Sequence, residues 1–137
     1  MYILAHYHEG YPCIVIISSV FHHVAPPPSP TGLTASPMIT SIDLTWVQPT
    51  NTGDMVESYI ISYTFSINGC PGEDGGDMIT LNDETTRQYT ISGVEEDARY
   101  TISITAMNGA GSSNPVTIMT TTLIAGIYTV ICNFVSH

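Results

Sequence analysis

Positive charge is the scarcest feature of this sequence. Its 137 residues hold two Lys and Arg against twelve Asp and Glu, which gives a formal net charge of −10. Nucleic-acid binding depends on Lys and Arg contacts to phosphates, so this balance argues against a nucleic-acid partner. The same shortage disfavours adhesion to anionic lipid head groups. A basic protein surface or a divalent cation suits the sign of the charge better.

Histidine is absent from the whole middle of the chain, and this limits the chemistry available there. The five histidines lie near the ends, at His6, His8, His22, His23 and His137. A Ser–His–Asp or Cys–His arrangement would have to recruit those ends. The glycine-rich residues 108–111 lie between two expected strands and open no helix, so they do not form a phosphate loop. We therefore predict no enzyme activity, no catalytic residue, no cofactor, no metal ligand and no small-molecule substrate.

Cysteine is also sparse, with Cys13, Cys70 and Cys132 far apart in the sequence. Their number is odd and no CxxC pair occurs, so neither a zinc site nor a redox motif is indicated. We expect three thiols that are unpaired or paired outside the chain, although the sequence leaves their pairing state open.

No apolar run reaches the length of about 20 residues that a membrane-spanning helix needs. Two interpretations remain open for residues 1–24: a signal peptide, or an atypical leader or fragment edge with no fold of its own. Residues 25–30, Ala-Pro-Pro-Pro-Ser-Pro, predict a stiff Pro-rich linker. Residues 124–137 form an unassigned apolar tail, either the start of a truncated span or the off-frame end of a gene product. The module lies between these end segments, and we expect any membrane anchoring to come only from sequence outside the module.

Alternating patterns fill the middle of the chain. Tyr100, Ile102, Ile104 and Ala106 share one face of their segment, and hydroxyl residues occupy the other. A period of two is typical of a strand with one buried face, and β-branched and aromatic residues suit it. The pattern predicts a core between two sheets, made of Leu44, Trp46, Tyr59, Ile61, Ile91, Tyr100, Ile102 and Ile104.

Turn residues divide this part of the chain into short strands at regular spacing. We expect strands at residues 31–35, 41–47, 56–65, 78–81, 89–92, 100–108 and 116–122. Several short strands separated by Gly, Pro and Asn turns are typical of an all-β sandwich.

The segment before Tyr100 carries a more specific signal. Val94 lies six residues earlier, so a buried Tyr100 ring could return its hydroxyl to the intervening backbone, as in the tyrosine corner of Greek-key sandwiches. With Trp46 in the second expected strand, the chain resembles the fibronectin type III family. The matching positions are Gly93, Val94, Tyr100, Asn108, Gly109 and Gly111. The family usually has a Pro-Gly turn where Glu96 and Asp97 stand, so we expect a less rigid turn.

The resemblance implies a seven-stranded immunoglobulin-like Greek-key β-sandwich over residues 27–123. It also implies a non-catalytic extracellular module for protein–protein interaction or spacing, in a secreted or membrane-anchored adhesion or receptor-type protein. The alternative is an ectodomain fragment of an enzyme-linked receptor, with a phosphatase or kinase domain outside this chain. Either interpretation calls for a protein partner, whose identity the sequence does not reveal.

Partner binding is expected in loops, because loops on a rigid scaffold usually carry it. In this topology residues 50–54 and 109–113 meet at one pole of the sandwich. The candidate binding residues there are Asn51, Asp54, Gly109, Ser112 and Ser113.

Acidic residues are expected to gather at the opposite pole, where residues 68–77 meet the corner at 95–97. The six are Glu73, Asp74, Asp77, Glu95, Glu96 and Asp97. A solvated cap that keeps the module soluble is one interpretation. Weak calcium binding is the sharper hypothesis, because hard cations bind carboxylate and carbonyl oxygens, although the spacing matches no defined calcium loop.

Overall fold

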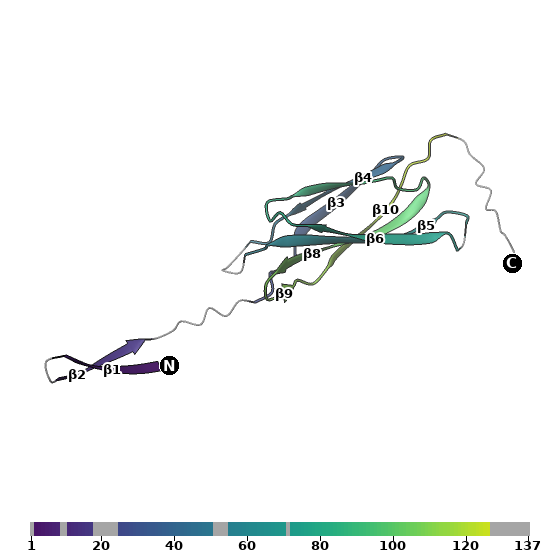
Figure 1. Ribbon diagram of the computed structural model, residues 1–137. Helices are drawn as coiled ribbons and strands as arrows, with labels where there is room; N and C mark the ends of the chain where they lie inside the picture. The colour runs from purple at the N-terminus through teal and green to yellow at the C-terminus, as the bar shows by residue number, and fades with distance from the viewer. Residues whose placement is uncertain (1, 9–10, 18–24, 51–54, 71, 127–137) are drawn as a thin grey trace.

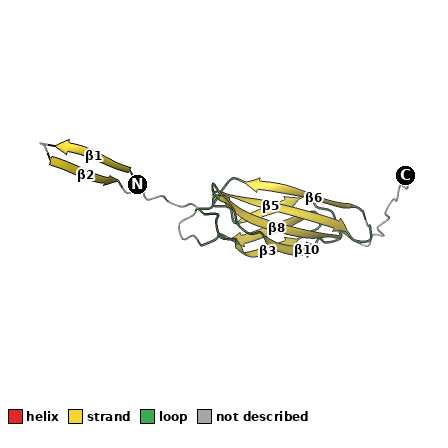
Figure 2. Ribbon diagram, turned by 90° about the horizontal axis from the view of Figure 1, so that it is seen from below, coloured by secondary structure: helices red, strands yellow, loops and turns green. Residues whose placement is uncertain are grey.

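The computed structural model describes residues 2–8, 11–17, 25–50, 55–70 and 72–126. From residue 25 onward they form a sandwich of two antiparallel sheets without a helix (Figures 1 and 2). The larger sheet has the order β10-β8-β5-β6, with β9 beside β8, and the smaller has the order β3-β4-β7. The strands are β3 (Thr31–Pro37), β4 (Ser41–Val47), β5 (Ser58–Ile67), β6 (Asp74–Leu81), β7 (Gln88–Ser92), β8 (Ala98–Asn108), β9 (Gly111–Ser112) and β10 (Val116–Thr121).

The core lies where the alternating sequence pattern predicted it. All eight residues expected between the sheets are buried, which confirms the assignment of the inward faces. Trp46 is 3% exposed and meets Tyr59 edge to face, with ring centroids 5.4 Å apart. This geometry is favourable for aromatic pairs, so Trp46 is a packing residue that joins the two sheets.

All seven expected strands are present, and β9 adds a two-residue pairing beside β8. The largest difference concerns β6, which begins at Asp74 instead of residue 78. Its first part contains Gly75 and Gly76, which read as loop residues in the sequence. A Cβ on Gly75 would lie 2.5 Å from the Phe65 ring on the neighbouring strand. Glycine is therefore needed here for close packing within the sheet.

The N-terminal segment contains a feature that the sequence did not predict. β1 (Tyr2–His8) and β2 (Tyr11–Ile17) form an antiparallel hairpin, whereas neither interpretation of residues 1–24, a signal peptide or an atypical leader or fragment edge, included a strand. An uninterrupted apolar run cannot be assigned to a strand by periodicity alone. Within the described residues, no strand of the sandwich pairs with this hairpin.

Cys70 is buried and disulfide-bonded. The expectation of a thiol unpaired or paired outside the chain is therefore wrong for this residue. Cysteine spacing in a sequence does not define which residues approach in the fold, and Cys70 follows a strand that the core holds in place. Among the described residues, we find no helix with the length and apolar character needed to cross a membrane.

Candidate protein-interaction site

The candidate site lies at the pole where β5 begins and β8 ends. The Glu57 backbone N–H donates to the Met107 carbonyl at 2.8 Å, and Ser58 pairs with Met107 in the sheet. A Cβ on Gly109 would lie 3.8 Å from Glu57 Oε1, so the Glu57 carboxylate stands beside the β8–β9 turn. Glu57, which follows the 50–54 loop in the chain, thus lies beside the β8–β9 turn. Residues 51–54 themselves lie outside the described residues, so the meeting of the two loops stays a prediction.

The predicted site residues have different environments. Gly109 and Ser112 are exposed, whereas Asn51 and Asp54 are outside the described residues. Ser113 is buried, and its hydroxyl accepts from the Ala106 N–H and donates to the Asn114 carbonyl, both at 3.0 Å. The Ser113 side chain holds β8 to the following segment, so it is not available for a partner in this structure.

Asn108 organises the turn that carries Gly109. Its Oδ1 accepts from the N–H of Ala110 at 2.9 Å and of Gly111 at 3.2 Å. Its Nδ2 donates to the Ala25 carbonyl at 2.8 Å, 83 positions away in the sequence. Asn108 is only 8% exposed, and hydrogen bonding of this kind is what a buried amide requires.

The Pro-rich segment lies against the same turn. Pro26 is so close to Gly111 that a Cβ there would lie 3.3 Å from Pro26 Cγ. Ser29 Oγ donates to the Asn114 carbonyl at 2.8 Å, and both Pro27 and Pro30 are buried. In Figure 1 the chain reaches the sandwich beside β9. The prediction of a stiff linker missed these contacts, since composition indicates stiffness and not what the segment touches.

The corner at the opposite pole has the predicted geometry. The Glu95 N–H donates to the Tyr100 hydroxyl at 2.8 Å, which confirms the tyrosine corner. The Tyr100 ring stacks on Phe65 with centroids 5.2 Å apart. Burial raises the pKa of the Tyr100 hydroxyl above its usual value, because the charged form would lose its hydration.

The acidic pole brings its two segments together without forming a metal site. Asn68 Nδ2 donates to Asp97 Oδ1 at 2.7 Å, and the Asn68 N–H donates to the Asp97 carbonyl at 3.0 Å. Asp77, however, pairs with Tyr63, four residues before β5 ends at Ile67. Among the described residues, no three His, Cys, Asp or Glu side chains are placed to hold a metal ion. The structure gives no support to the calcium hypothesis.

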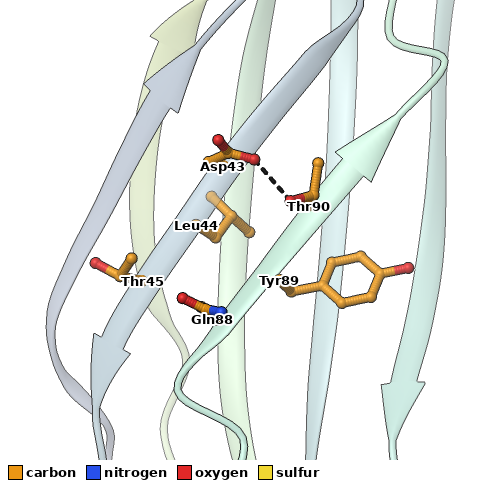
Figure 3. A pocket seen from close by; sticks show the side chains of 6 residues that line it. All are labelled: Asp43, Leu44, Thr45, Gln88, Tyr89 and Thr90. Atoms are coloured by element: carbon orange, nitrogen blue, oxygen red, sulfur yellow. Dashed lines mark hydrogen bonds between the residues drawn. The ribbon is translucent and has the colours of Figure 1, made fainter.

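A shallow depression of about 530 Å³ lies on the smaller sheet, between β4 and β7. Thr90 Oγ1 donates to Asp43 Oδ1 at 2.6 Å across the two strands. Figure 3 shows this contact, with the Tyr89 ring pointing away from it. Asp43 is the one carboxylate among the six residues that line the depression.

The family of the chain follows from comparison with known proteins. A model of the fibronectin type III domain matches residues 27–122. The chain belongs to the fibronectin type III family. The Tyr100 corner and the Trp46 core thus lie in a fibronectin type III sandwich.

Curated relatives of this fibronectin type III chain include two proteins that are much longer than the chain itself. Neogenin from Homo sapiens is 30% identical over 90 residues, which are 66% of this chain and 6% of neogenin. The netrin receptor DCC from Homo sapiens gives the same identity and coverage. The match therefore spans 6% of the length of these relatives.

Solved structures show the same fold. The fn3 domain of the human collagen alpha-1(XX) chain has a TM-score of 0.60 at 16% identity, covering 80% of this chain and 97% of that one. The FN5 domain of Drosophila Lar has a TM-score of 0.53 at 22% identity, covering 72% of this chain and 99% of that one. At these identities the likeness establishes the fold alone.

Proposed function

We propose that this chain serves as a non-catalytic protein-interaction or spacer module of an extracellular adhesion or receptor-type protein. The observation that carries the proposal is the 30% identity with neogenin and the netrin receptor DCC, confined to one module's length of those proteins. The module comprises residues 27–123, and residues 1–24 and 124–137 lie outside it. Its acidic composition favours a partner with a basic surface.

The proposed contact surface is the pole formed by residues 50–54 and 109–112. Exposed Gly109 and Ser112 support this choice, as does the exposed Glu57 carboxylate beside Gly109. Asn51 and Asp54 are assigned to the same surface from the sequence alone, since both lie outside the described residues. Ser113 is excluded because its hydroxyl is engaged inside the module.

A binding screen tests both the proposed interaction role and the proposed contact surface. The full chain is presented as a soluble bait to a panel of purified ectodomains, and any partner is then titrated with a loop variant that carries Gly/Ser in residues 50–54 together with Ser112→Lys at the exposed position of the other loop. We expect the variant to lose binding by at least tenfold, which corresponds to about 1.4 kcal/mol. Gln88→Glu, on the outer side of the smaller sheet, is the control and keeps full affinity.

Each of two results would contradict one part of the proposal and leave the other part standing. Equal binding by the loop variant would move the contact away from this pole and leave the interaction role intact. Absence of binding to every protein of the panel, with the fold intact, would favour a spacer without a partner.

A further inference from the structure

The disulfide-bonded Cys70 lies at the pole of the sandwich where the chain leaves its last strand. It comes two positions after Asn68, whose N–H donates to the Asp97 carbonyl at 3.0 Å. The Ala125 N–H donates to Glu96 Oε2 at 3.1 Å. The segment before Cys70 and the chain beyond β10 therefore meet the corner at two adjacent residues. In Figure 1 the turn after β5 and the chain beyond β10 lie at the same end of the sandwich.

The partner of Cys70 is one of two residues. The structure consists of a single chain with three cysteines, so Cys70 is bonded to Cys13 or to Cys132. Cys132 comes seven positions after Ala125, and seven residues of extended chain span about 24 Å. Cys132 can therefore reach Cys70 from the same pole, without crossing the sandwich.

Cys13 would have to come from the opposite pole. It precedes Ala25 by twelve positions, and Ala25 is bound by Asn108 at the end of β8. β5 is ten residues long, so the two poles are about 33 Å apart, and twelve residues of extended chain span about 40 Å. Cys13 would reach Cys70 only if the chain ran almost straight along the sandwich. Within the described residues, however, β2 pairs with β1 and with no strand of the sandwich.

An apolar patch lies at the pole of Cys70. The Leu123 N–H donates to the Met38 carbonyl at 3.1 Å, which joins the chain beyond β10 to the turn between β3 and β4. The patch consists of Met38, Ile39, Leu123 and Ile124, each between 36% and 52% exposed. They are four of the eight large apolar side chains that remain exposed among the described residues. Contiguous exposed apolar side chains are typical of a surface that another segment or a partner covers.

We propose that Cys132 is the disulfide partner of Cys70 and that residues 127–135 cover this apolar patch. These residues, Ile-Tyr-Thr-Val-Ile-Cys-Asn-Phe-Val, follow the patch directly in the chain and carry no charged side chain. Contact between the two apolar surfaces removes both from water, which is favourable. Residues 127–135 then extend the module beyond residue 123 and do not enter a membrane. This inference does not depend on the loop pole proposed above.

The bond has a chemical requirement and a consequence for stability. Joining two thiols as a disulfide releases two protons and two electrons, which a disulfide oxidant such as oxidised glutathione takes up as it becomes two thiols. Disulfides persist in oxidising extracellular surroundings, which agrees with the extracellular location proposed above. The bond closes a long loop from Cys70 to Cys132, and long loops are those in which a disulfide constrains the unfolded chain most.

Peptide mapping without reduction tests the pairing, because trypsin can cut this chain only after Arg87 and Arg99. The full chain is refolded in a glutathione redox buffer, free thiols are blocked with N-ethylmaleimide, and the monomer is isolated. A Cys70–Cys132 bond joins peptide 1–87 to peptide 100–137, whereas a Cys13–Cys70 bond lies within peptide 1–87. We expect the joined species in the native chain and in Cys13→Ser, and its loss in Cys132→Ser.

Methionine oxidation tests the cover over the patch. Hydrogen peroxide converts accessible methionine to the sulfoxide, and Met38 has internal references in Met55 and Met119, which are exposed and lie outside the patch. In the native chain we expect Met38 to oxidise about tenfold more slowly than both references, because the cover must first open locally. In Cys132→Ser the oxidation rate of Met38 should approach that of the references.

Other outcomes overturn the proposal. Separate peptides from the native chain would exclude the pairing, and loss of the joined species in Cys13→Ser would indicate a Cys13–Cys132 bond instead. Equal oxidation of Met38 and its references in the native chain would mean that residues 127–135 leave the patch open. Protection of Met38 that persists unchanged in Cys132→Ser would show that the bond does not hold the segment there. The native chain and Cys13→Ser decide the pairing even if Cys132→Ser does not fold.

Discussion

The Tyr100 hydroxyl accepts a hydrogen bond of 2.8 Å from the backbone N–H of Glu95, five positions earlier in the chain. This contact ties the corner at residues 93–97 to β8, the strand at the centre of the larger sheet. The same ring packs on Phe65 of β5. One side chain thus fixes a connection between the two sheets and contributes to the core.

Tyr100→Phe should destabilise the module while leaving its packing intact. The change removes the acceptor of the Glu95 N–H and keeps the ring. We expect the free energy of unfolding to fall by about 0.5–1.5 kcal/mol, and more if the N–H stays unpaired in the folded state. Urea denaturation followed by tryptophan fluorescence measures the change.

Tyr59→Phe is the matched control. Its hydroxyl is buried and makes no hydrogen bond of normal geometry among the described residues. Burial raises its pKa, and the Arg87 charge and a weak interaction with the Trp46 side chain act against that rise. Removing an unpaired buried hydroxyl is neutral or stabilising. A loss of stability as large for Tyr59→Phe as for Tyr100→Phe would contradict the role assigned to the corner hydrogen bond.

The module should lose stability at alkaline pH. Burial raises the pKa values of Tyr59, Tyr63 and Tyr100 above the usual value of about 10 for tyrosine. Between the unfolded and folded pKa values the folded state binds more protons, so the free energy of unfolding decreases as pH rises above about 10. Thermal unfolding between about pH 8 and pH 12 measures this decrease. A melting temperature that does not fall across this range would show that these hydroxyls ionise as easily in the folded state.

Asn108→Ala should loosen the turn at the candidate site and the chain segment before β3. The substitution leaves the Ala110 and Gly111 N–H groups and the Ala25 carbonyl without their partner. We expect a loss of about 1–3 kcal/mol and faster hydrogen exchange at the Ala110 and Gly111 amides. Asn114→Ala, at an exposed position, is the control. Unchanged exchange at both amides in Asn108→Ala would show that the side chain does not hold the turn.

Local patterns in the sequence were sufficient for the strands and the core. Trp46 and Tyr100 could be assigned because each lies in an alternating segment, and alternation reports directly on burial. The corner followed from the short distance between Val94 and Tyr100 along the chain. These features depend on neighbours in sequence.

Contacts between distant segments could not be predicted in the same way. Asn108 meets Ala25 across 83 positions, and no periodicity connects them. Gly75 reads as a loop residue until the Phe65 ring beside it is known. The burial of Ser113 likewise depends on its bonds to Ala106 and Asn114, so the sequence placed it among exposed loop residues.

Gly111→Ala tests how strictly the β8–β9 turn beside Pro26 requires a glycine. Gly111 has a φ of 145°, a conformation that side chains rarely adopt, and an added Cβ would lie 3.3 Å from Pro26 Cγ. Backbone strain of this kind costs about 1–3 kcal/mol, so we expect Gly111→Ala to lower the free energy of unfolding by at least that amount. Gly109→Ala is the matched control, since that residue does not have a positive φ and its nearest neighbour atom would be 3.8 Å away. In urea denaturation, Gly111→Ala should therefore have a clearly lower midpoint concentration than Gly109→Ala. Equal midpoints would mean that the turn relaxes freely and that Pro26 moves away without cost, and the packing of residues 25–30 on the turn would then not contribute to stability.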